Sequence, residues 1–229
     1  MKDGGSRATR KRQAGERAAE MATDGDVVGL GTGSTAAYAT EALGAAVARG
    51  HDITGIPTSY HSRAVALDAG IPLTELDAVD AVDIAIDGAD EVVDGDLIKG
   101  GGAAHTREKI VDAAADRFVV VVDDSKETDV LSHPVPVEVV PAARPTVMKT
   151  VRDMDGEPTL RSAGRKDGPV ITQHGNLVLD CDFGPIEDPA AISTALSTIP
   201  GVLEHGLFVD VADEIVVGGP EGVQVRSTR

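Results

Sequence analysis

Short apolar segments alternate with helix-forming segments along the first half of the chain. The segments "DVVGLG" (Asp26–Gly31), "AVDIAID" (Ala81–Asp87) and "FVVVVDD" (Phe118–Asp124) are nearly continuous hydrophobic runs. Between them lie stretches such as Ser34–Gly50 and Thr106–Arg117, which are rich in helix-forming residues. Strands that are apolar on both faces and separated by helices are typical of a parallel sheet covered on both sides. We therefore predict an α/β fold with a doubly wound, mostly parallel, Rossmann-like sheet.

The pattern changes after residue 131. The later segments follow the order β-α-β-β-α-β, which is the ferredoxin-like order. They are "HPVPVEVVP", "RPTVMKTVRDM", "EPTLRS", "NLVLDCDFG", "DPAAISTALSTI" and "VLEHGLFVDV". The closing "DEIVVGGPEGVQVR" resembles a hairpin that rejoins the first domain. We predict a catalytic α/β domain from residues 1–131 and 204–229, with an inserted, smaller α+β ferredoxin-like domain from 132–203.

The charge balance excludes several classes of partner. The 229 residues include 21 Lys and Arg against 38 Asp and Glu, so the formal net charge is −17. A surface this acidic repels nucleic acid and anionic membranes, so we expect neither as a partner. Acid-rich, lysine-poor surfaces suit a protein that stays soluble where salt screens charge repulsion, which indicates a halophilic source.

The single cysteine, Cys181, excludes an intrachain disulfide and a cysteine-based zinc site. The basic N-terminus lacks the apolar region of a secretory signal. No run of 18 apolar residues is present that could span a membrane. We expect a cytoplasmic globular protein.

The first motif with chemical potential is "GLGTGSTA" (Gly29–Ala36), at a predicted strand-to-helix turn. Glycines there let the backbone approach an anion, and the N-terminus of a helix attracts negative charge. The hydroxyls of Thr32, Ser34 and Thr35 suit a terminal phosphate. A dinucleotide site would need an acid at the end of the second strand, where the sequence has "PTSY" (Pro57–Tyr60). A purely structural turn is the third interpretation.

The second motif, "DGADEV" (Asp87–Val92), follows the third predicted strand. Ligands of open α/β sheets bind outside the carboxyl ends of the strands, so Asp87 and Asp90 are expected to face that crevice. The alternative is an ordinary turn on an acidic surface, because Asp-Gly is a common turn pair.

The third motif, "IKGGGAAHTREKI", places three glycines after Lys99. Three glycines are costly to order, but they let backbone N–H groups reach an oxygen-rich substrate. Lys99 supplies a cation or acid, and Glu108 is a candidate base for removing a proton from carbon. Glu108 is equally suited to stabilise the helix dipole, and His105 has no partner spaced to orient it, so we assign His105 no role.

The fourth motif is "VVDDSKETD", again at the end of a predicted strand. Lys126 could reach a phosphate or a substrate oxygen, or it could be a solvated lysine. A lysine in so lysine-poor a chain favours the functional interpretation slightly. Four strand-end motifs at one edge of a sheet are stronger support for a site than any motif alone.

These motifs, in this order, closely resemble the type A family of ribose-5-phosphate isomerases. The resemblance continues through "PVPVEVVP", "GNLVLDCDF", "IPGVLEHGLF" and "ADEIVVG", which together with the motifs extend over about nine tenths of the chain. It implies interconversion of ribose 5-phosphate and ribulose 5-phosphate through an enediol, with no metal or other cofactor. It also implies the composite fold predicted above and a homodimer or homotetramer.

The resemblance implies roles for individual residues. Glu108 occupies the position of the proton acceptor, Asp87 is our candidate for opening the sugar ring, and Lys99 with the glycine amides is suited to stabilise the enediolate. The implied substrate-binding residues are Thr32, Gly33, Ser34, Thr35, Asp87, Gly88, Ala89, Asp90, Lys99, Gly100, Gly101, Gly102 and Lys126.

Two other functions are compatible with parts of the sequence. A nicotinamide-dependent dehydrogenase would explain the first glycine motif, but the ribose-binding acid is missing. A non-catalytic sugar-phosphate sensor would explain the binding motifs. Such a sensor would be expected to have lost Glu108 or Lys99, and this chain has both.

Overall fold

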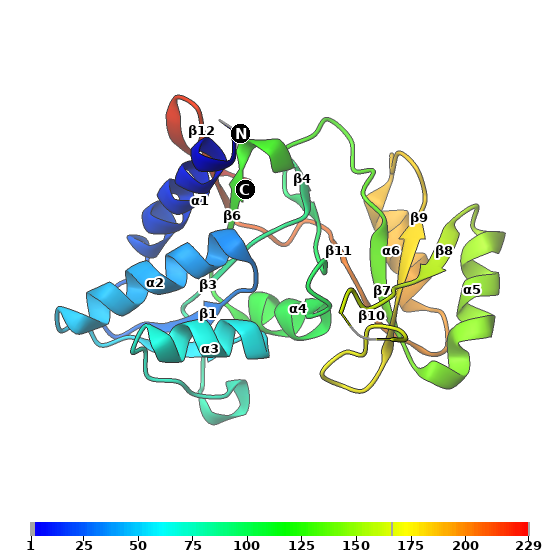
Figure 1. Ribbon diagram of the computed structural model, residues 1–229, viewed down its shortest axis with the longest axis horizontal. Helices are drawn as coiled ribbons and strands as arrows, with labels where there is room; N and C mark the ends of the chain where they lie inside the picture. Colours follow the sequence, from blue (N-terminus) through cyan, green and yellow to red (C-terminus); the bar gives the residue numbers. More distant parts are fainter. Residues whose placement is uncertain (1–2, 166, 229) are drawn as a thin grey trace. The chain divides into compact units, whose positions relative to one another are not determined.

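The computed structural model describes residues 3–165 and 167–228 (Figure 1). The chain divides into two compact units. The main unit comprises Met1–Ala89, Arg107–Glu127 and Val211–Arg229, and the smaller unit comprises Asp90–Thr106 and Thr128–Asp210. The first two residues of the basic N-terminus lie outside the described residues.

A six-stranded sheet forms the centre of the main unit, in the order β13-β12-β6-β3-β1-β2. The first five strands in chain order run parallel, and β13 pairs antiparallel with β12 as the predicted closing hairpin. The strands are β1 (Val27–Leu30), β2 (Thr54–Pro57), β3 (Ile84–Asp87), β6 (Phe118–Asp123), β12 (Glu214–Gly219) and β13 (Gly222–Ser227). The prediction of a mostly parallel, Rossmann-like sheet is confirmed.

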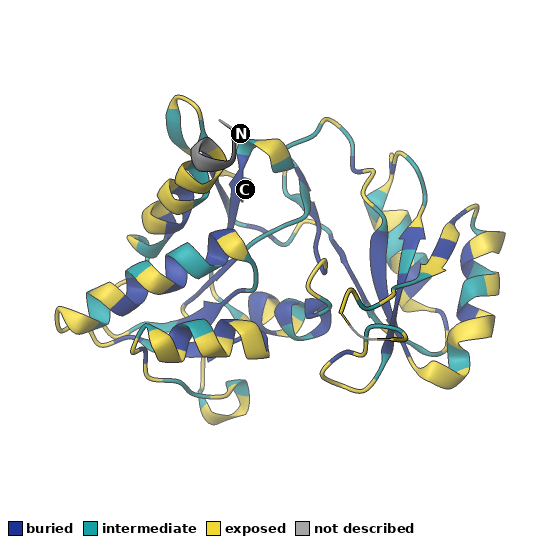
Figure 2. Cartoon of the chain, viewed as in Figure 1, coloured by how far each residue is buried: buried dark blue, intermediate teal, exposed yellow. Residues whose placement is uncertain are grey.

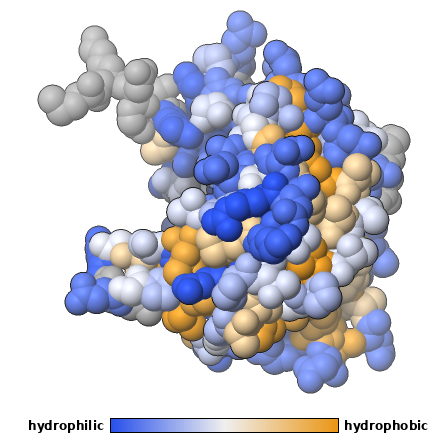
Figure 3. All heavy atoms as spheres, turned by 90° about the vertical axis from the view of Figure 1, so that its right-hand side faces the viewer, coloured by the Kyte–Doolittle hydropathy of each residue, from blue (hydrophilic) through white to orange (hydrophobic). Residues whose placement is uncertain are grey.

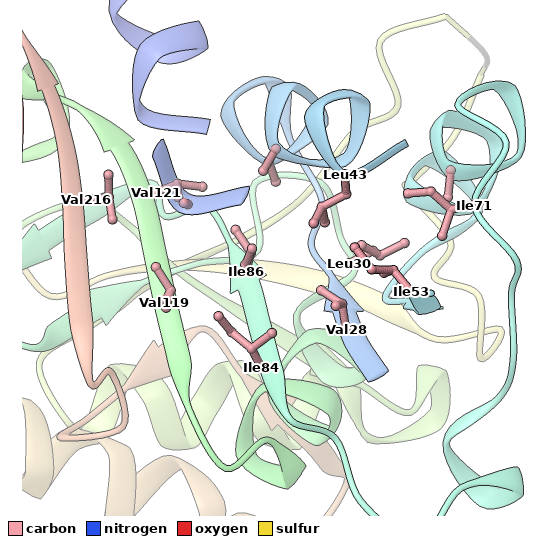
Figure 4. Close-up of a cluster of buried hydrophobic side chains, with 14 of the residues drawn as sticks. Val28, Leu30, Leu43, Ile53, Ile71, Ile84, Ile86, Val119, Val121 and Val216 are labelled. Atoms are coloured by element: carbon pink, nitrogen blue, oxygen red, sulfur yellow. The ribbon is translucent and has the colours of Figure 1, made fainter. Parts of the chain in front are cut away.

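Helices cover both faces of this sheet. The helices of the main unit are α1 (Asp3–Ala19), α2 (Ser34–Ala48), α3 (Tyr60–Asp68) and α4 (His105–Ala114), whose first two residues belong to the smaller unit. Alternate strand residues meet alanines of α1, α2 and α3 and Leu43 of α2 in one core (Figure 4). On the opposite face, Val111 of α4 packs with Ile56 and Val82. The five parallel strands are accordingly buried along most of their length, whereas β13 and the outer helix faces are largely exposed (Figure 2).

The strand order reverses beside β1. From β1 the chain passes to β2 on one side, and β3 and then β6 lie on the other side. In doubly wound sheets this reversal leaves a crevice at the carboxyl ends of the two central strands, where ligands bind. The ends of β1, β3 and β6 are therefore neighbours at one edge of the sheet.

The smaller unit contains the predicted β-α-β-β-α-β order. Its four-stranded antiparallel sheet has the order β10-β7-β9-β8. The elements are β7 (Val135–Val139), α5 (Arg144–Asp153), β8 (Glu157–Leu160), β9 (Leu177–Asp182), α6 (Pro189–Ser197) and β10 (Val202–His205). Side chains from both helices and the sheet form a separate core. The ferredoxin-like prediction is confirmed.

A small three-stranded sheet in this unit was not predicted. It consists of β4 (Glu91–Val93), β5 (Asp96–Ile98) and β11 (Leu207–Phe208), in the order β11-β5-β4. The predicted strand "VLEHGLFVDV" is consequently two strands, β10 and β11, separated at Gly206. A Cβ atom at Gly206 would lie 2.1 Å from the carbonyl oxygen of Lys99, so only glycine allows this approach.

The boundaries of the smaller unit differ from the predicted 132–203, because this unit comprises residues 90–106 and 128–210. Residues 90–106 join the smaller unit because β5 pairs with β11, a contact between segments about a hundred residues apart, and β4 pairs with β5. The described residues also form three short 3₁₀ turns, at Leu76–Ala78, Asp124–Lys126 and Pro141–Ala143. Among the described residues, none of the helices has the length and apolar character that crossing a membrane requires.

Candidate active site

The first glycine motif forms the turn between β1 and α2. Gly33 adopts φ +121°, a conformation that favours glycine, and α2 begins at the next residue, Ser34. The helix thus presents its N-terminal N–H groups at the carboxyl end of β1, which is the arrangement that binds anions. Ser34 is exposed there, and Thr35 is 8% exposed.

Asp87 ends β3 beside this turn and is completely buried. Its Oδ1 accepts hydrogen bonds from the backbone N–H of Thr32, at 2.8 Å, and of Gly88, at 2.6 Å. Gly31 makes this position possible, because a Cβ atom there would lie 2.2 Å from Oδ1 of Asp87. The carboxylate therefore joins the ends of β1 and β3 at the strand-order reversal.

Hydroxyl groups, not an acid, occupy the end of β2. The Thr32 hydroxyl lies 3.0 Å from Oγ1 of Thr58 and donates to Oγ of Ser59 at 2.7 Å. Ser59 also caps α3 by accepting from the N–H of Ser62. No carboxylate is in this described cluster to hold the ribose of a dinucleotide, so the geometry does not favour the dehydrogenase interpretation.

Lysines surround the end of β6. Lys126 lies in the 3₁₀ turn that follows this strand and is partly exposed. Lys11, on α1, donates from Nζ to Oγ of Ser34 at 2.9 Å and lies 3.8 Å from Oδ2 of Asp123. Burial tends to raise the pKa of Asp123, but hydrogen bonds from Ser125 and Arg7 outweigh it and lower the pKa. Asp123 therefore stays ionised and attracts the Lys11 ammonium towards the turn.

Glu108 lies in the first turn of α4 and is 3% exposed. The helix is held close to the sheet because Gly29 of β1 has no side chain, and a Cβ atom there would lie 2.8 Å from Cγ1 of Val111. A carboxylate so deeply buried in an acidic protein is unusual, because exposed positions are available to it at lower cost.

The second glycine motif belongs to the smaller unit. Lys99 follows β5, is 2% exposed, and holds its Nζ 5.4 Å from the centre of the Phe208 ring. Gly100 adopts φ +105°, and the N–H of Gly101 donates to Oδ2 of Asp90 at 2.7 Å. The predicted residues thus fall into two groups: Asp90 with Lys99–Gly102 in the smaller unit, and the others in the main unit. Among the described residues there is no group of three or more potential metal ligands.

Comparisons with known proteins identify the family. The family model "Ribose 5-phosphate isomerase A (phosphoriboisomerase A)" matches residues 54–222. The ribose-5-phosphate isomerase A of Haloarcula marismortui is 64% identical over 227 residues, which are 99% of each chain. The chain belongs to the ribose-5-phosphate isomerase A family.

Solved structures agree with this family assignment. The chain is similar to a D-ribose-5-phosphate isomerase in complex with phospho-erythronic acid, with a TM-score of 0.94 and 44% identity over 96% of this chain and 99% of the other. It is also similar to ribose 5-phosphate isomerase A from Methanocaldococcus jannaschii, with a TM-score of 0.92 and 43% identity. That match covers 96% of this chain and 98% of the other. Some of its relatives come from halophilic archaea, which agrees with the acidic composition of this chain.

Two groups that contact the first glycine motif come from distant segments and are not among the predicted site residues. They are Lys11 on α1 and Thr58 at the end of β2. No local signal marks either residue, because each is defined by its contact with the first glycine motif. The scarcity of lysine was the one signal that could have drawn attention to Lys11.

Proposed function

We propose that this family member interconverts ribose 5-phosphate and ribulose 5-phosphate through an enediol, with Glu108 as the general base. The observation that carries the assignment of roles is the burial of three ionisable side chains, Asp87, Lys99 and Glu108, which are 0%, 2% and 3% exposed. Charged groups are seldom this buried unless they are paired or used in chemistry.

The reaction begins with ring opening. Ribose 5-phosphate is mostly a closed furanose, so a proton must leave the anomeric hydroxyl and another must reach the ring oxygen. Asp87 is proposed to transfer these protons, and Asp90 to hold substrate hydroxyls. A carboxylate fixed by two backbone N–H groups, as Asp87 is, keeps one oxygen in place while the sugar changes shape.

Glu108 then moves a proton between two carbons. Its carboxylate takes the proton from C2, the C–H electron pair forms the C1=C2 bond, and the carbonyl π electrons move to the oxygen on C1. The proton of the C2 hydroxyl passes to the oxyanion on C1. The C2–O electrons then form the ketone, and the C1=C2 π electrons take the proton back from the protonated Glu108 at C1. A well-placed base of this kind contributes about a hundred- to ten-thousand-fold in rate.

The negative charge on the enediolate needs hydrogen-bond donors. Lys99 and the backbone N–H groups of Gly100–Gly102 are proposed to supply them, because charge that develops only in the transition state is best stabilised by donors already in place. The phosphate is proposed to lie on the turn of Thr32, Gly33, Ser34 and Thr35, with Lys126 as its cation. Lys11 is added to this group because its ammonium already contacts Ser34.

The decisive experiment is conversion of ribose 5-phosphate to ribulose 5-phosphate in molar KCl with a chelator present. Turnover is expected without added metal. Glu108→Gln is expected to abolish turnover and to bind substrate almost as well as the wild type, whereas the exposed Glu41→Gln on α2 should leave both unchanged. A folded wild-type protein that binds the sugar phosphate but does not convert it would refute the isomerase proposal and favour a sensor.

The partner proposed for the chain is a second copy of itself, as a homodimer or homotetramer in the cytoplasm. Figure 3 shows one face of the molecule, on which hydrophobic surface lies between hydrophilic residues. Large apolar side chains are at least 39% exposed at Tyr60, Leu67, Ile110, Val140, Ile171, Leu203 and Val225. Light scattering after gel filtration in molar KCl measures the assembly, and a monomeric mass would contradict it.

A further inference from the structure

One arginine outside every predicted motif contacts the second glycine motif. Arg161 follows β8, and its N–H pairs with the carbonyl of Val178. Its Nη1 donates to the carbonyl oxygen of Gly100 at 2.8 Å and to that of Gly101 at 3.2 Å. The side chain is only 16% exposed, and its bond to the buried Gly100 is partly shielded from water, whereas the bond to Gly101 lies at the surface.

Asp180 on β9 fixes the guanidinium from the other side. Nε of Arg161 donates to both carboxylate oxygens of Asp180, at 2.9 and 3.1 Å, and Nη2 donates to Oδ1. This fork is the bidentate geometry that arginine forms with carboxylates and that lysine cannot reproduce. One edge of the guanidinium therefore faces Asp180, and Nη1 is left for the glycine motif.

The consequence for the motif follows from peptide geometry. A trans peptide points its C=O and N–H in opposite directions, and the described residues contain no cis peptide bond. The carbonyl of Gly100 shares a peptide with the N–H of Gly101, and the carbonyl of Gly101 shares one with the N–H of Gly102. By holding these two carbonyls, Arg161 turns both N–H groups away from itself.

An independent contact agrees with this direction. The N–H of Gly101 donates to Oδ2 of Asp90 at 2.7 Å, so the first peptide is held at both ends, by Arg161 at its carbonyl and by Asp90 at its N–H. Only glycine fits at either position, because a Cβ atom at Gly101 would lie 2.8 Å from Oδ1 of Asp90 and one at Gly100 would lie 2.8 Å from Nδ1 of His105. A cation at the carbonyl also polarises each peptide and strengthens its N–H as a donor.

We propose that Arg161, oriented by Asp180, is a positioning residue for the isomerase reaction that acts through the Gly101 and Gly102 N–H groups. Arg161 itself does not touch the sugar in this proposal. Through the carbonyl of Gly100 it keeps the Gly101 N–H on the carboxylate of Asp90, and through the carbonyl of Gly101 it directs the Gly102 N–H that stabilises the enediolate. The inference rests on the role proposed above for the glycine motif.

Arg161→Lys is the sharpest test, because it keeps the charge and loses the fork. We expect kcat/KM to fall about ten- to a hundred-fold, the loss typical of displaced catalytic groups. Inhibition by phospho-erythronic acid, a sugar-acid phosphate whose carboxylate resembles an enediolate in charge, should weaken by a similar factor, while KM for ribose 5-phosphate changes little. Asp180→Asn, which keeps the arginine and removes its carboxylate partner, should shift both quantities in the same direction.

Controls separate this inference from a general loss of structure and from failure of the proposed function. Arg152→Ala removes an exposed positive charge at the end of α5 in the same unit and should leave kinetics and inhibition unchanged. Should Arg161→Lys fail to fold, Asp180→Asn gives the same comparison. If the wild type is active but the variants keep its kcat or its inhibition constant, the positioning role is refuted. An inactive wild type would instead overturn the isomerase reaction itself.

Discussion

A buried carboxylate in the smaller unit allows a quantitative prediction of stability. Glu138 on β7 is 1% exposed and accepts hydrogen bonds from four side chains. The donor to Oε2 is Thr106, at 2.5 Å, and the groups hydrogen-bonded to Oε1 are Thr172 at 2.7 Å, His174 at 3.0 Å and Asn176 at 3.0 Å. These partners come from separate segments, so the carboxylate links residues that are distant in the sequence.

Two substitutions at Glu138 should have clearly different costs. Glu138→Leu leaves the hydroxyls of Thr106 and Thr172, which are 6% and 7% exposed, without their acceptor. Each buried group left unsatisfied costs about 1–3 kcal/mol, so the unfolding free energy should fall by about 2–6 kcal/mol. In Glu138→Gln, the side-chain carbonyl can still accept from the groups that bond to Oε1, and the amide can donate to the hydroxyl of Thr106. Only the extra strength of hydrogen bonds to a charged acceptor is then lost, at about 1–2 kcal/mol.

Urea unfolding at neutral pH in molar KCl, followed by circular dichroism, measures these differences. Glu157→Gln on the exposed side of β8 is the matched control and should shift the unfolding free energy by less than about 0.5 kcal/mol. The reasoning would be refuted if Glu138→Leu were as stable as Glu138→Gln, because the buried donors would then have found other partners.

The same network predicts a pH dependence. Burial alone would raise the pKa of Glu138, but the hydrogen bonds from Thr106, Thr172, Asn176 and His174 outweigh it and lower the pKa from its ordinary value of 4.5. A lowered pKa contributes stability that is fully present above the ordinary value and is lost as the pH falls through the folded value. The advantage of the wild type over Glu138→Gln should therefore shrink below about pH 4.5. An advantage that grew with acidity would contradict this sign.

Three further outcomes follow from the structure. Gly31→Ala should reduce both activity and melting temperature, because its Cβ would lie 2.2 Å from Asp87, and an unchanged melting temperature would contradict that contact. Burial raises the pKa of the Cys181 thiol to about 12, so Ellman's reagent at pH 8 should label it only in denaturant, and rapid labelling of the native protein would argue against this burial. Transfer from molar KCl to about 0.1 M, where the Debye length is about 10 Å, should destabilise a chain of net charge −17, and a salt-independent melting temperature would refute this.

Much of the fold was predictable because its signals are local. The apolar run from Phe118 and the glycines before Ser34 each define a strand or a helix start within a few residues, and chain order then determines a doubly wound sheet. The motifs were assigned to the edge of that sheet by the same logic. Asp87 was expected at the crevice, and it does lie where β1 and β3 end.

What could not be predicted depends on contacts between distant segments. The strands β4, β5 and β11 have two or three residues each, too few for an alternating pattern to be recognised. Gly206 separates β10 from β11 because of a carbonyl about a hundred positions earlier, at Lys99. Arg161 carries no signal of its own, since "TLRS" is an ordinary strand end and its meaning lies in the two carbonyls it binds.

The position of β12 in the main sheet has a consequence for synthesis on the ribosome. β12 lies between β6 and β13, and Gly218 approaches the backbone of α1 so closely that a Cβ atom there would lie 2.1 Å from the carbonyl of Arg10. During synthesis, the main sheet therefore has an unpaired edge at β6 until residues 214–227 leave the ribosome. Residues 128–210 of the smaller unit are synthesised before that point. An unpaired strand edge invites aggregation, so a nascent chain of this protein is most vulnerable while its inserted unit is already able to fold.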